Sequence, residues 1–336
     1  MVRDDCLVSV TSHDVARRAG VSQPTVSRAL RGDVRVAEAT RARVRRAADE
    51  LGYVASELGR SLATRTTRQV AMVADLENAL YPTLVGPLHD RFAEHGLRMV
   101  LLAERGDDRS TYDRVLDRSV DGVVLTTTLL DSSLSSELLA RRVPFVELNR
   151  LSGLATDGVT ADNLSGGAAC ARILLEAGHR RIAAVFGTGV TSSVNDREAG
   201  FRATLAEAGV DLPDHRVTRG WFGVDDGDRA LSLLMTGRHK PTAVFCAGGD
   251  SVAVGVVNRA LRTGLSVPGD LAVVGFDDLA IAAWPQFELT TVRVDFPAMA
   301  LAAADRLVAR LGGDETPVST EVFGVEPVLR RSHLQL

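Results

Sequence analysis

The chain has 336 residues, of which 45% are hydrophobic, and this is enough apolar material for more than one folded domain. Its net charge is −4, but the first 68 residues carry 13 arginines and 8 acidic side chains, whereas the other 268 carry 26 basic and 35 acidic ones. A basic segment joined to an acidic body is typical of a protein in which one domain contacts DNA. Three scattered cysteines argue against disulfides and thiolate metal sites, and the absence of a signal segment or long apolar run predicts a cytoplasmic protein without membrane contact.

Residues 11–30 predict two short helices joined by a tight turn. Thr11 and Ser22 are suited to cap the two helix starts, and Gly20 supplies a left-handed residue that ends the first helix. Pro24 fits the first turn of the second helix. The apolar residues share one face of each helix, so polar side chains remain on the outside, as on a recognition helix that reads base edges. An ordinary surface helical hairpin fits the same pattern.

A third helix is predicted over residues 36–51. Apolar residues recur there at helical spacing, at Val44, Ala47, Ala48 and Leu51. Four arginines occupy the other faces, at positions 41, 43, 45 and 46. These positive groups are able to neutralise phosphates, so the three helices predict a compact DNA-binding headpiece.

Residues 52–68 are polar and rich in Ala, Ser and Thr, which is typical of a linker. A short helix from Ser56 to about Leu62 is possible, although Gly59 in its middle costs roughly 1 kcal/mol relative to alanine. Such a segment is expected to fold only against a partner.

From Gln69 onward, short apolar runs alternate with amphipathic stretches. The apolar runs predict strands at Val70–Ala74, Met99–Ala103, Val123–Thr126, Phe145–Leu148, Ile182–Phe186, Ala243–Cys246 and Leu271–Phe276. Amphipathic stretches predict helices near 83–95, 165–177, 197–208 and 250–263. This alternation indicates parallel sheets covered on both faces, and its length favours two α/β lobes with crossovers near 160–165 and 291–295. A ligand would lie between the lobes, at the carboxyl ends of the strands.

Several ordered motifs closely resemble the lactose/galactose-repressor (LacI/GalR) family of bacterial transcription regulators, over essentially the whole chain. In the first part they are residues 10–32, 40–53 and 56–62. In the body they are TADN (160–163), GHRRIA (178–183), REAGF (197–201), PTAVF (241–245), VPGDLAVVGFDD (267–278) and LTTVR (289–293).

The resemblance implies an α/β fold class: an all-α helix-turn-helix headpiece followed by a two-lobed, periplasmic-binding-protein-like effector domain with parallel sheets. The headpiece would span 8–55, the hinge helix and linker 56–68, and the effector-binding and dimerisation domain 69–336. Lobe 1 would comprise about 69–163 and 294–320, and lobe 2 about 164–293 and 321–332.

The resemblance also implies a regulator, most plausibly a repressor, that binds a pseudo-palindromic double-stranded DNA operator as a homodimer. The implied DNA-binding residues are Thr11, Ser22, Gln23, Pro24, Thr25, Ser27, Arg28, Ser56, Gly59 and Leu62. Leu62 matches the residue that the family inserts into the minor groove, although it could instead pack on its own domain. Gly59 departs from the alanine usual in that hinge.

A small-molecule effector, a sugar or sugar derivative, would bind between the lobes. The implied contacts are Asp75, Leu80, Tyr81, Asp162, Arg197, Phe222, Asp250 and Asp277. Gly248-Gly249 and Val294 depart from polar positions of the family, which leaves two alternatives open: an unusual sugar, or a ligand that is not a sugar. The buried aspartates and Arg197 could equally form structural ion pairs.

Two other classes of protein fit part of the sequence. A nucleotide-binding enzyme would suit the strand that runs into GTGVTS, but Ser192 stands where a dinucleotide fingerprint needs a third glycine. A solute-binding protein of a transporter would suit the body but not the headpiece. No catalytic or metal-binding constellation is found in the sequence, so neither catalytic residues nor a cofactor are expected.

Overall fold

The structure is a computed structural model that describes residues 10–54, 66–104, 109–117, 119–237 and 240–334. By its internal contacts the chain divides into two compact units, Met1–Thr67 and Arg68–Leu336. Among the described residues, no helix combines the length and apolar composition that spanning a membrane requires.

The first unit is a three-helix headpiece. Its helices are α1 (Ser12–Ala19), α2 (Gln23–Leu30) and α3 (Glu38–Leu51). As the sequence predicts, Thr11 precedes α1, and both its backbone N–H (3.0 Å) and its hydroxyl (2.7 Å) donate to the Asp14 carboxylate. Gly20 ends α1 in the left-handed region at φ 64°. Valines and alanines from the three helices form the core, namely Val15, Ala16, Ala19, Val26, Ala29, Val36, Val44, Ala47 and Ala48.

The second unit contains two α/β lobes. The sheet of lobe 1 is wholly parallel, in the order β11-β5-β4-β3-β1-β2. Its strands are β1 (Gln69–Ala74), β2 (Arg98–Ala103), β3 (Gly122–Leu125), β4 (Phe145–Leu148), β5 (Gly158–Ala161) and β11 (Thr320–Phe323). Its helices are α5 (Pro82–Glu94), α6 (Arg109–Leu116), α7 (Ser133–Arg141) and α12 (Phe296–Leu311).

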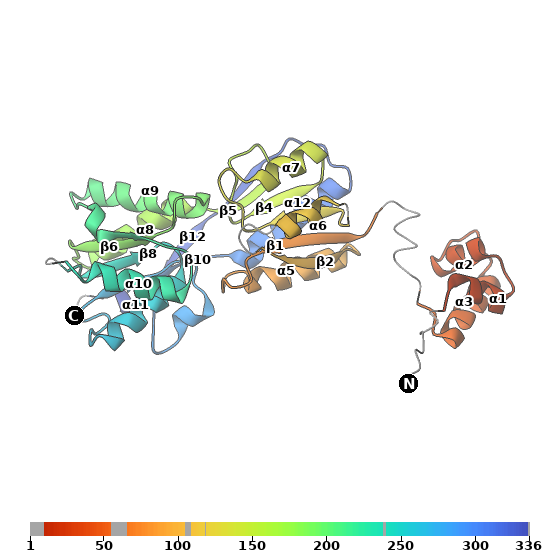
Figure 1. The fold of residues 1–336 in the computed structure, drawn as a ribbon, viewed down its shortest axis with the longest axis horizontal. Coiled ribbons are helices and arrows are strands. Elements are labelled where there is room, and N and C mark those ends of the chain that lie inside the picture. The colour runs from red at the N-terminus through yellow and green to blue at the C-terminus, as the bar shows by residue number, and fades with distance from the viewer. Residues whose placement is uncertain (1–9, 55–65, 105–108, 118, 238–239, 335–336) are drawn as a thin grey trace, which may run out of the picture. The chain divides into compact units, whose positions relative to one another are not determined.

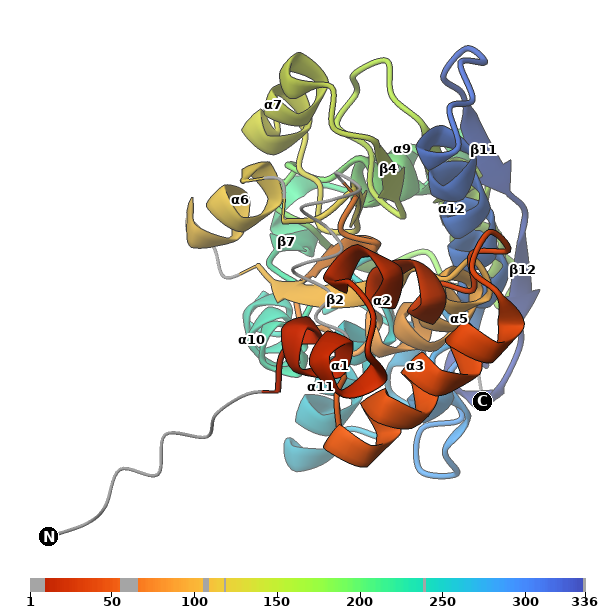
Figure 2. The same ribbon diagram turned by 90° about the vertical axis from the view of Figure 1, so that its right-hand side faces the viewer.

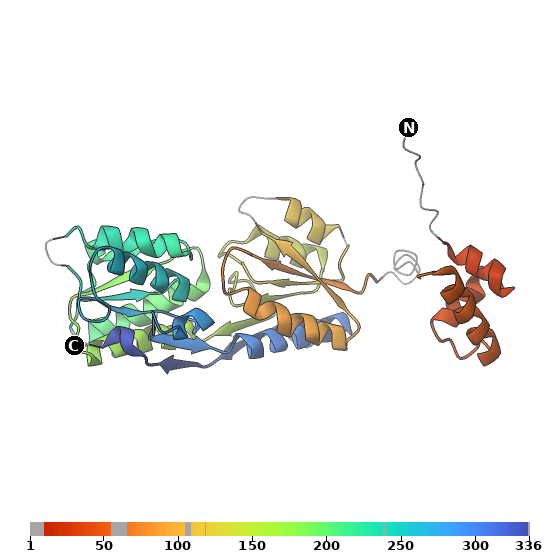
Figure 3. The same ribbon diagram turned by 90° about the horizontal axis from the view of Figure 1, so that it is seen from below.

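Alternate residues of β1 belong to two different cores, because side chains of a strand point to opposite faces of the sheet. Val70 and Met72 pack with residues of α5 and α12. Ala71 and Val73 pack with residues of α6 and α7 on the other face. Figure 3 shows this sheet with a helical layer on each side.

Lobe 2 repeats this architecture with a parallel sheet in the order β7-β6-β8-β9. Its strands are β6 (Ile182–Phe186), β7 (Val217–Arg219), β8 (Ala243–Cys246) and β9 (Ala272–Val274). Helices α8 (Asn163–Glu176) and α9 (Ser192–Glu207) cover one face, and α10 (Val224–Leu234) and α11 (Asp250–Arg262) cover the other (Figure 1). Short 3-10 helices lie at η1 (Asp214–Arg216), η2 (Ala280–Ala283) and η3 (Arg331–His333).

The chain crosses between the lobes three times. It passes from β5 into α8 at Asp162, and from β10 (Thr291–Val294) into α12 at Asp295. These crossings lie where the sequence predicts them. The last crossing is at Gly324, because β11 continues the six-stranded sheet to Phe323, beyond the expected boundary at residue 320. The strand that follows, β12 (Val325–Val328), pairs antiparallel with β10, and Figure 2 shows β11 and β12 following one another.

Candidate DNA interface and effector site

The N-terminal part of α2 exposes polar side chains, as the sequence predicts. Thr11, Ser22, Pro24 and Arg28 are exposed, and Gln23, Thr25 and Ser27 are half-buried. Val26 and Ala29, in contrast, are completely buried and fix which side of α2 faces the core. The polar residues therefore lie outside the core, around the start of one helix. The remaining expected contacts, Ser56, Gly59 and Leu62, lie outside the described residues.

These polar side chains make few bonds within the headpiece. The Gln23 amide donates to the Ser12 hydroxyl at 3.3 Å, and the Arg28 Nε donates to the Pro24 carbonyl at 3.3 Å. The hydroxyl of Ser22 bonds that of Thr25 at 2.8 Å rather than capping the backbone of α2. Such long or local bonds exchange readily for bonds to a partner, which suits a surface that contacts DNA.

Arg41 corrects one sequence-based expectation. It was grouped with the arginines that neutralise phosphates, but it is half-buried, and its guanidinium donates to the carbonyls of Asp33 (3.2 Å) and Val36 (2.9 Å). It also pairs with Glu38. Arg41 therefore holds the turn before α3, and the exposed arginines of this helix are Arg43, Arg45 and Arg46.

In the second unit, most of the expected effector contacts lie in the loops that connect strands to helices. Most follow the carboxyl end of a parallel strand or begin the helix after it, where ligands of open α/β sheets bind. Asp75 follows β1, Asp162 follows β5, Phe222 follows β7, Asp250 follows β8 and Asp277 follows β9. Leu80 and Tyr81 precede α5, and Arg197 lies in the second turn of α9.

Arg197 is the central residue of this region and is 4% exposed. Its guanidinium donates to the Asn163 amide oxygen (2.8 Å), the Ala247 carbonyl (2.9 Å) and the Asp277 carboxylate (3.1 Å). It also lies 3.7 Å from the centre of the Phe276 ring. Burial raises the pKa of Asp277, and the positive charge of Arg197 opposes that rise. The structural ion pair that the sequence left open is thus present.

Two glycines allow α8 and α9 to pack closely, and this close packing fixes the position of Arg197 on α9. A Cβ at Gly167 of α8 would overlap the Arg197 carbonyl, and one at Gly200 of α9 would overlap the Leu164 carbonyl. Helices approach this closely only where both lack side chains, since interiors are packed at crystal-like density. The glycine of the REAGF motif therefore sets the distance between α8 and α9.

Asp250 is completely buried rather than lining an open site. Its carboxylate accepts from the Thr291 hydroxyl and the Leu279 N–H, each at 2.7 Å. Burial raises its pKa well above the usual range, and the nearby charge of Asp277 adds to the rise. Gly249, just before it, has φ 104°, and its missing Cβ leaves room for the Asp277 carboxylate. Asp250 thus joins β10 to the segment that follows β9.

The other expected contacts differ in how open they are. Tyr81 and Leu80 belong to the core, and the Tyr81 hydroxyl donates to the Thr126 carbonyl at 3.1 Å. Asp75 and Phe222 are half-buried. Asp162 is half-buried too, and its carboxylate caps α8 by accepting from the Ser165 N–H at 3.0 Å. Of the expected contacts, these half-buried residues are the ones whose side chains remain accessible.

Sequence reasoning missed Asn149 and Arg150, which directly follow β4. Arg150 is 6% exposed, and its guanidinium lies 4.5 Å from the centre of the Phe222 ring, which belongs to lobe 2. Asn149 is buried with φ 73°. A signal existed, because this polar pair ends an apolar run just as Asp162 and Asp277 do.

Hydrogen bonds donated by two backbone N–H groups of lobe 1 join the lobes near Arg150. The Leu151 N–H donates to the Ser192 hydroxyl at 2.8 Å, and the Leu130 N–H donates to the Val190 carbonyl at 2.9 Å. Beside them, in lobe 1, lies a cavity of about 210 Å³. Its lining includes Glu104, Thr127, Thr128, Asp131 and Ser132.

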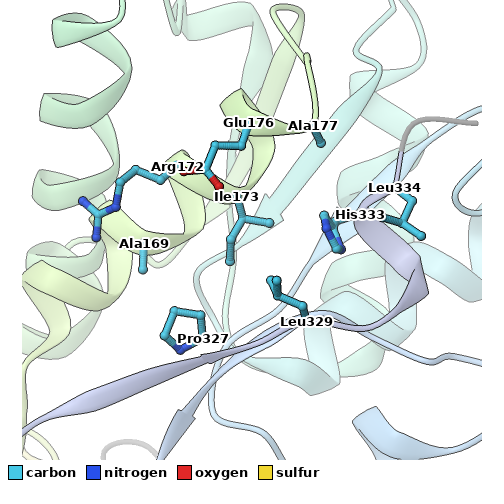
Figure 4. Close-up of a pocket in the computed structure, with 9 residues that line it drawn as sticks. All are labelled: Ala169, Arg172, Ile173, Glu176, Ala177, Pro327, Leu329, His333 and Leu334. Atoms are coloured by element: carbon cyan, nitrogen blue, oxygen red, sulfur yellow. The ribbon is translucent and has the colours of Figure 1, made fainter.

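A second cavity, of about 570 Å³, lies in lobe 2 and contains none of the expected effector contacts. Figure 4 shows it between α8 and the segment from β12 to the last described residues. It is lined by Ala169, Arg172, Ile173, Glu176, Ala177, Pro327, Leu329, His333 and Leu334.

Comparisons with known proteins agree with this architecture. Residues 11–56 match the family described as "Bacterial regulatory proteins, lacI family", and residues 171–333 match a "Periplasmic binding protein-like domain". The chain is 31% identical to the ribose operon repressor of Escherichia coli (strain K12) over 334 residues, which cover 97% of this chain and 96% of the relative.

Solved structures are similar over the same length. The Lac repressor dimer bound to operator and the anti-inducer ONPF has a TM-score of 0.86 at 25% identity, covering 97% of this chain and 99% of that one. The complex of the transcriptional regulator CelR with cellobiose has a TM-score of 0.74 at 31% identity, covering 96% and 99%.

A three-helix headpiece with a polar outer helix, followed by a two-lobed α/β body, defines a DNA-binding transcriptional regulator. With 31% identity along nearly the full length of a known repressor, the chain belongs to the lacI family of bacterial regulatory proteins.

Proposed function

We propose that this protein represses transcription by binding a pseudo-palindromic operator as a homodimer, and that a sugar or sugar derivative bound between its lobes controls the affinity. The observation that carries the proposal is the polar outer face of α2 opposite its buried Val26 and Ala29. The relatives support the rest: one is named a ribose operon repressor, and related solved structures hold operator DNA or cellobiose.

On the DNA side, α2 would enter the major groove with Gln23 and Pro24 leading. An amide such as Gln23 pairs with adenine through two hydrogen bonds, which discriminates by about 1–3 kcal/mol against other bases. Its 3.3 Å bond to Ser12 would be exchanged for bonds to the base. Pro24 has no side-chain donor or acceptor, so it would make an apolar contact, for example with a thymine methyl. Ser56, Gly59 and Leu62 would contact the minor groove at the operator centre.

On the effector side, Asp162 and Phe222 would bind the ligand directly, because both are half-buried at strand ends. Asp162 would accept hydrogen bonds from sugar hydroxyls while it caps α8, and Phe222 would stack on an apolar sugar face. Arg197 and Asp277 would use their remaining hydrogen-bonding capacity to bind the ligand. Asp250 and Tyr81, which are buried, would not contact the ligand but would hold the surrounding backbone in place. The proposal gives none of these residues a catalytic role.

Ligand binding would change how the lobes meet at the loops that contain Leu130 and Leu151, and this change would reach the headpieces of a dimer. Coupling between two sites of this kind is typically about 1–3 kcal/mol, a change of 5–150-fold in affinity. We further propose that the protein acts in the cytoplasm, where its operator DNA is found.

The test selects operators from random duplex DNA with the full-length protein and then measures affinity with and without candidate sugars. We expect a palindromic consensus, and we expect Gln23→Ala to relax the preference at one base of each half-site. Ala42→Gln, on the exposed face of α3, is the matched control and should leave the consensus unchanged. Equal affinity for selected and scrambled duplexes would contradict the proposal.

A further inference from the structure

Arg150 is a buried guanidinium without an anionic partner. Its side chain is 6% exposed, and among the residues that the structure describes it forms no hydrogen bond or ion pair. Its guanidinium stacks on the Phe222 ring. Arg197, by comparison, uses three donors and pairs with Asp277. A guanidinium has five N–H donors, and those of Arg150 donate to no protein group in the described part of the chain, so they remain available to a ligand.

The groups around Arg150 do not supply that partner. Burial raises the pKa values of Tyr81, Glu104 and Asp277, and the positive charge of Arg150 lowers each of them. Arg150 therefore lies near all three groups. The Asp277 carboxylate is already bonded to Arg197, and the Glu104 carboxylate accepts from the Thr127 hydroxyl. Neither makes direct contact with Arg150.

Two other polar atoms of lobe 1 are unsatisfied as well, one of them on the residue before Arg150. The Asn149 side-chain oxygen and the Thr128 hydroxyl are both buried and have no hydrogen-bond partner in the described part of the chain. Buried polar atoms are nearly always bonded in native proteins, and exceptions call for an explanation. The loop that carries Asn149 and Arg150 is held in place before any ligand arrives, since the buried Glu147 accepts from the Ser152 N–H (2.9 Å) and the Thr156 hydroxyl (3.1 Å).

We infer that the effector carries an anionic group, a carboxylate or a phosphate, and that Arg150 binds this group. The planar guanidinium matches two oxygens of either group through parallel hydrogen bonds, while its face stays stacked on Phe222. Because Arg150 belongs to lobe 1 and Phe222 to lobe 2, the same contact would hold the lobes together around the ligand. The inference rests on the proposed effector site between the lobes and specifies the ligand as a sugar acid or sugar phosphate.

The test measures binding to the full chain by calorimetry at constant ionic strength, with three matched compounds in each of two series. One series is ribose, ribonate and ribose 5-phosphate, and the other is glucose, gluconate and glucose 6-phosphate. In at least one series we expect an anionic compound to bind about tenfold or more tightly than its neutral parent. The carboxylate and phosphate arms then identify which anion the site prefers.

Variants test whether Arg150 causes the preference for anionic compounds. Arg150→Gln should abolish the difference between anionic and neutral compounds, and Arg150→Lys should retain part of it, because an ammonium keeps the charge but not the planar pair of donors. Arg141→Gln removes the same charge from an exposed position of α7 and should leave the difference intact. Thermal unfolding without ligand checks that each variant is folded, and the comparison of anionic and neutral compounds on the unmodified chain needs no variant.

The outcomes separate this inference from the proposed function. If neutral compounds bind and change operator affinity but no anionic compound binds more tightly, the effector site stands and the inference about Arg150 is wrong. An anion preference that persists in Arg150→Gln also overturns it. If no compound of either series binds or alters operator affinity, the proposed sugar site fails together with the inference.

Discussion

The headpiece and the body differ in how deeply they bury a charged pair. In the headpiece, most arginines are exposed, and ion pairs such as Arg18–Glu50 lie at the surface with 59% and 42% of the side chains accessible. In the body, Arg197 and Asp277 pair with 5% and 7% accessible. Exposed pairs contribute little to stability, whereas breaking a buried pair leaves an uncompensated charge.

This contrast indicates different functions for the same side chain. Exposed arginines remain free to exchange water and counterions for phosphates, so they serve recognition of DNA. A buried and paired arginine such as Arg197 fixes elements relative to each other, and any ligand contact it makes is added to that structural role. The predictions below test that distinction.

Arg197→Ala is expected to have the largest effect. Removing it leaves the buried Asp277 carboxylate, the Asn163 oxygen and the Ala247 carbonyl without a donor. We expect a loss of about 3–5 kcal/mol in the unfolding free energy of the body, measured by denaturant titration. Arg18→Ala, at the exposed pair, should change the stability of the headpiece little. Equal losses at the two sites would contradict the distinction between the regions.

Gly200→Val tests the helix crossing that positions Arg197. Because the new side chain would overlap the Leu164 carbonyl, we expect a loss of about 1–3 kcal/mol or more in unfolding free energy, together with weaker effector binding. Gly86→Ala in α5 is the control, since a Cβ there meets no atom within 4 Å. It should be neutral or stabilising by roughly 0.5–1 kcal/mol, the helix propensity difference. Denaturant titration of the two variants compares them directly.

The headpiece was more predictable from the sequence than the site in the body. Its helix starts and ends depend on local chemistry: Thr11, Gly20 and Ser22 lie at the expected boundaries. Likewise, the seven strands predicted from apolar runs all form; six of them are almost wholly buried, and only β2 is largely accessible. Strands β11 and β12 carry mixed, largely exposed side chains, and β7 has three residues, so the apolar pattern gives no signal for them.

The site could be predicted only in part, because its contacts join residues far apart in the sequence. Strand ends locate Asp162 and Asp277, but nothing local indicates that Asp250 is buried against Thr291 or that Tyr81 belongs to the core. Arg41 could not be predicted for the same reason. Its bonds to the carbonyls of Asp33 and Val36 depend on the path of the chain before α3, which the sequence pattern does not give. Arg150 was missed because its importance lies in the lack of a partner, which only the packed structure reveals.

The buried Asp250 predicts a pH dependence of stability. Its pKa in the folded protein lies well above the ordinary value, so the folded state favours the protonated carboxyl. The stabilisation is therefore complete at pH values below the ordinary pKa of about 3.9 and is lost as the pH rises towards the folded value. Asp250→Asn removes this titration. Relative to the variant, we expect the unmodified chain to lose up to about 1.4 kcal/mol of unfolding free energy per pH unit above pH 4.

Denaturant titrations between pH 4 and pH 8 measure this difference. Asp225→Asn, on the exposed start of α10, is the matched control and should follow the unmodified chain across the range. A constant difference between the unmodified chain and Asp250→Asn at every pH would contradict the buried, protonated state.

The smallest expected effect is on the salt dependence of DNA binding, and it should differ between two arginines of α3. Arg45 is exposed, so Arg45→Gln should weaken operator and nonspecific DNA alike and reduce the salt dependence of binding by about one counterion, a slope change of roughly 0.9. Arg41→Gln, which removes the bonds to Asp33 and Val36, should instead lower the thermal stability of the headpiece and leave the salt slope of the folded protein unchanged. Fluorescence anisotropy across a salt series measures the slopes. If Arg41→Gln reduces the slope as much as Arg45→Gln does, Arg41 contacts phosphate despite its bonds within the headpiece, and exposure alone does not identify the DNA-binding arginines.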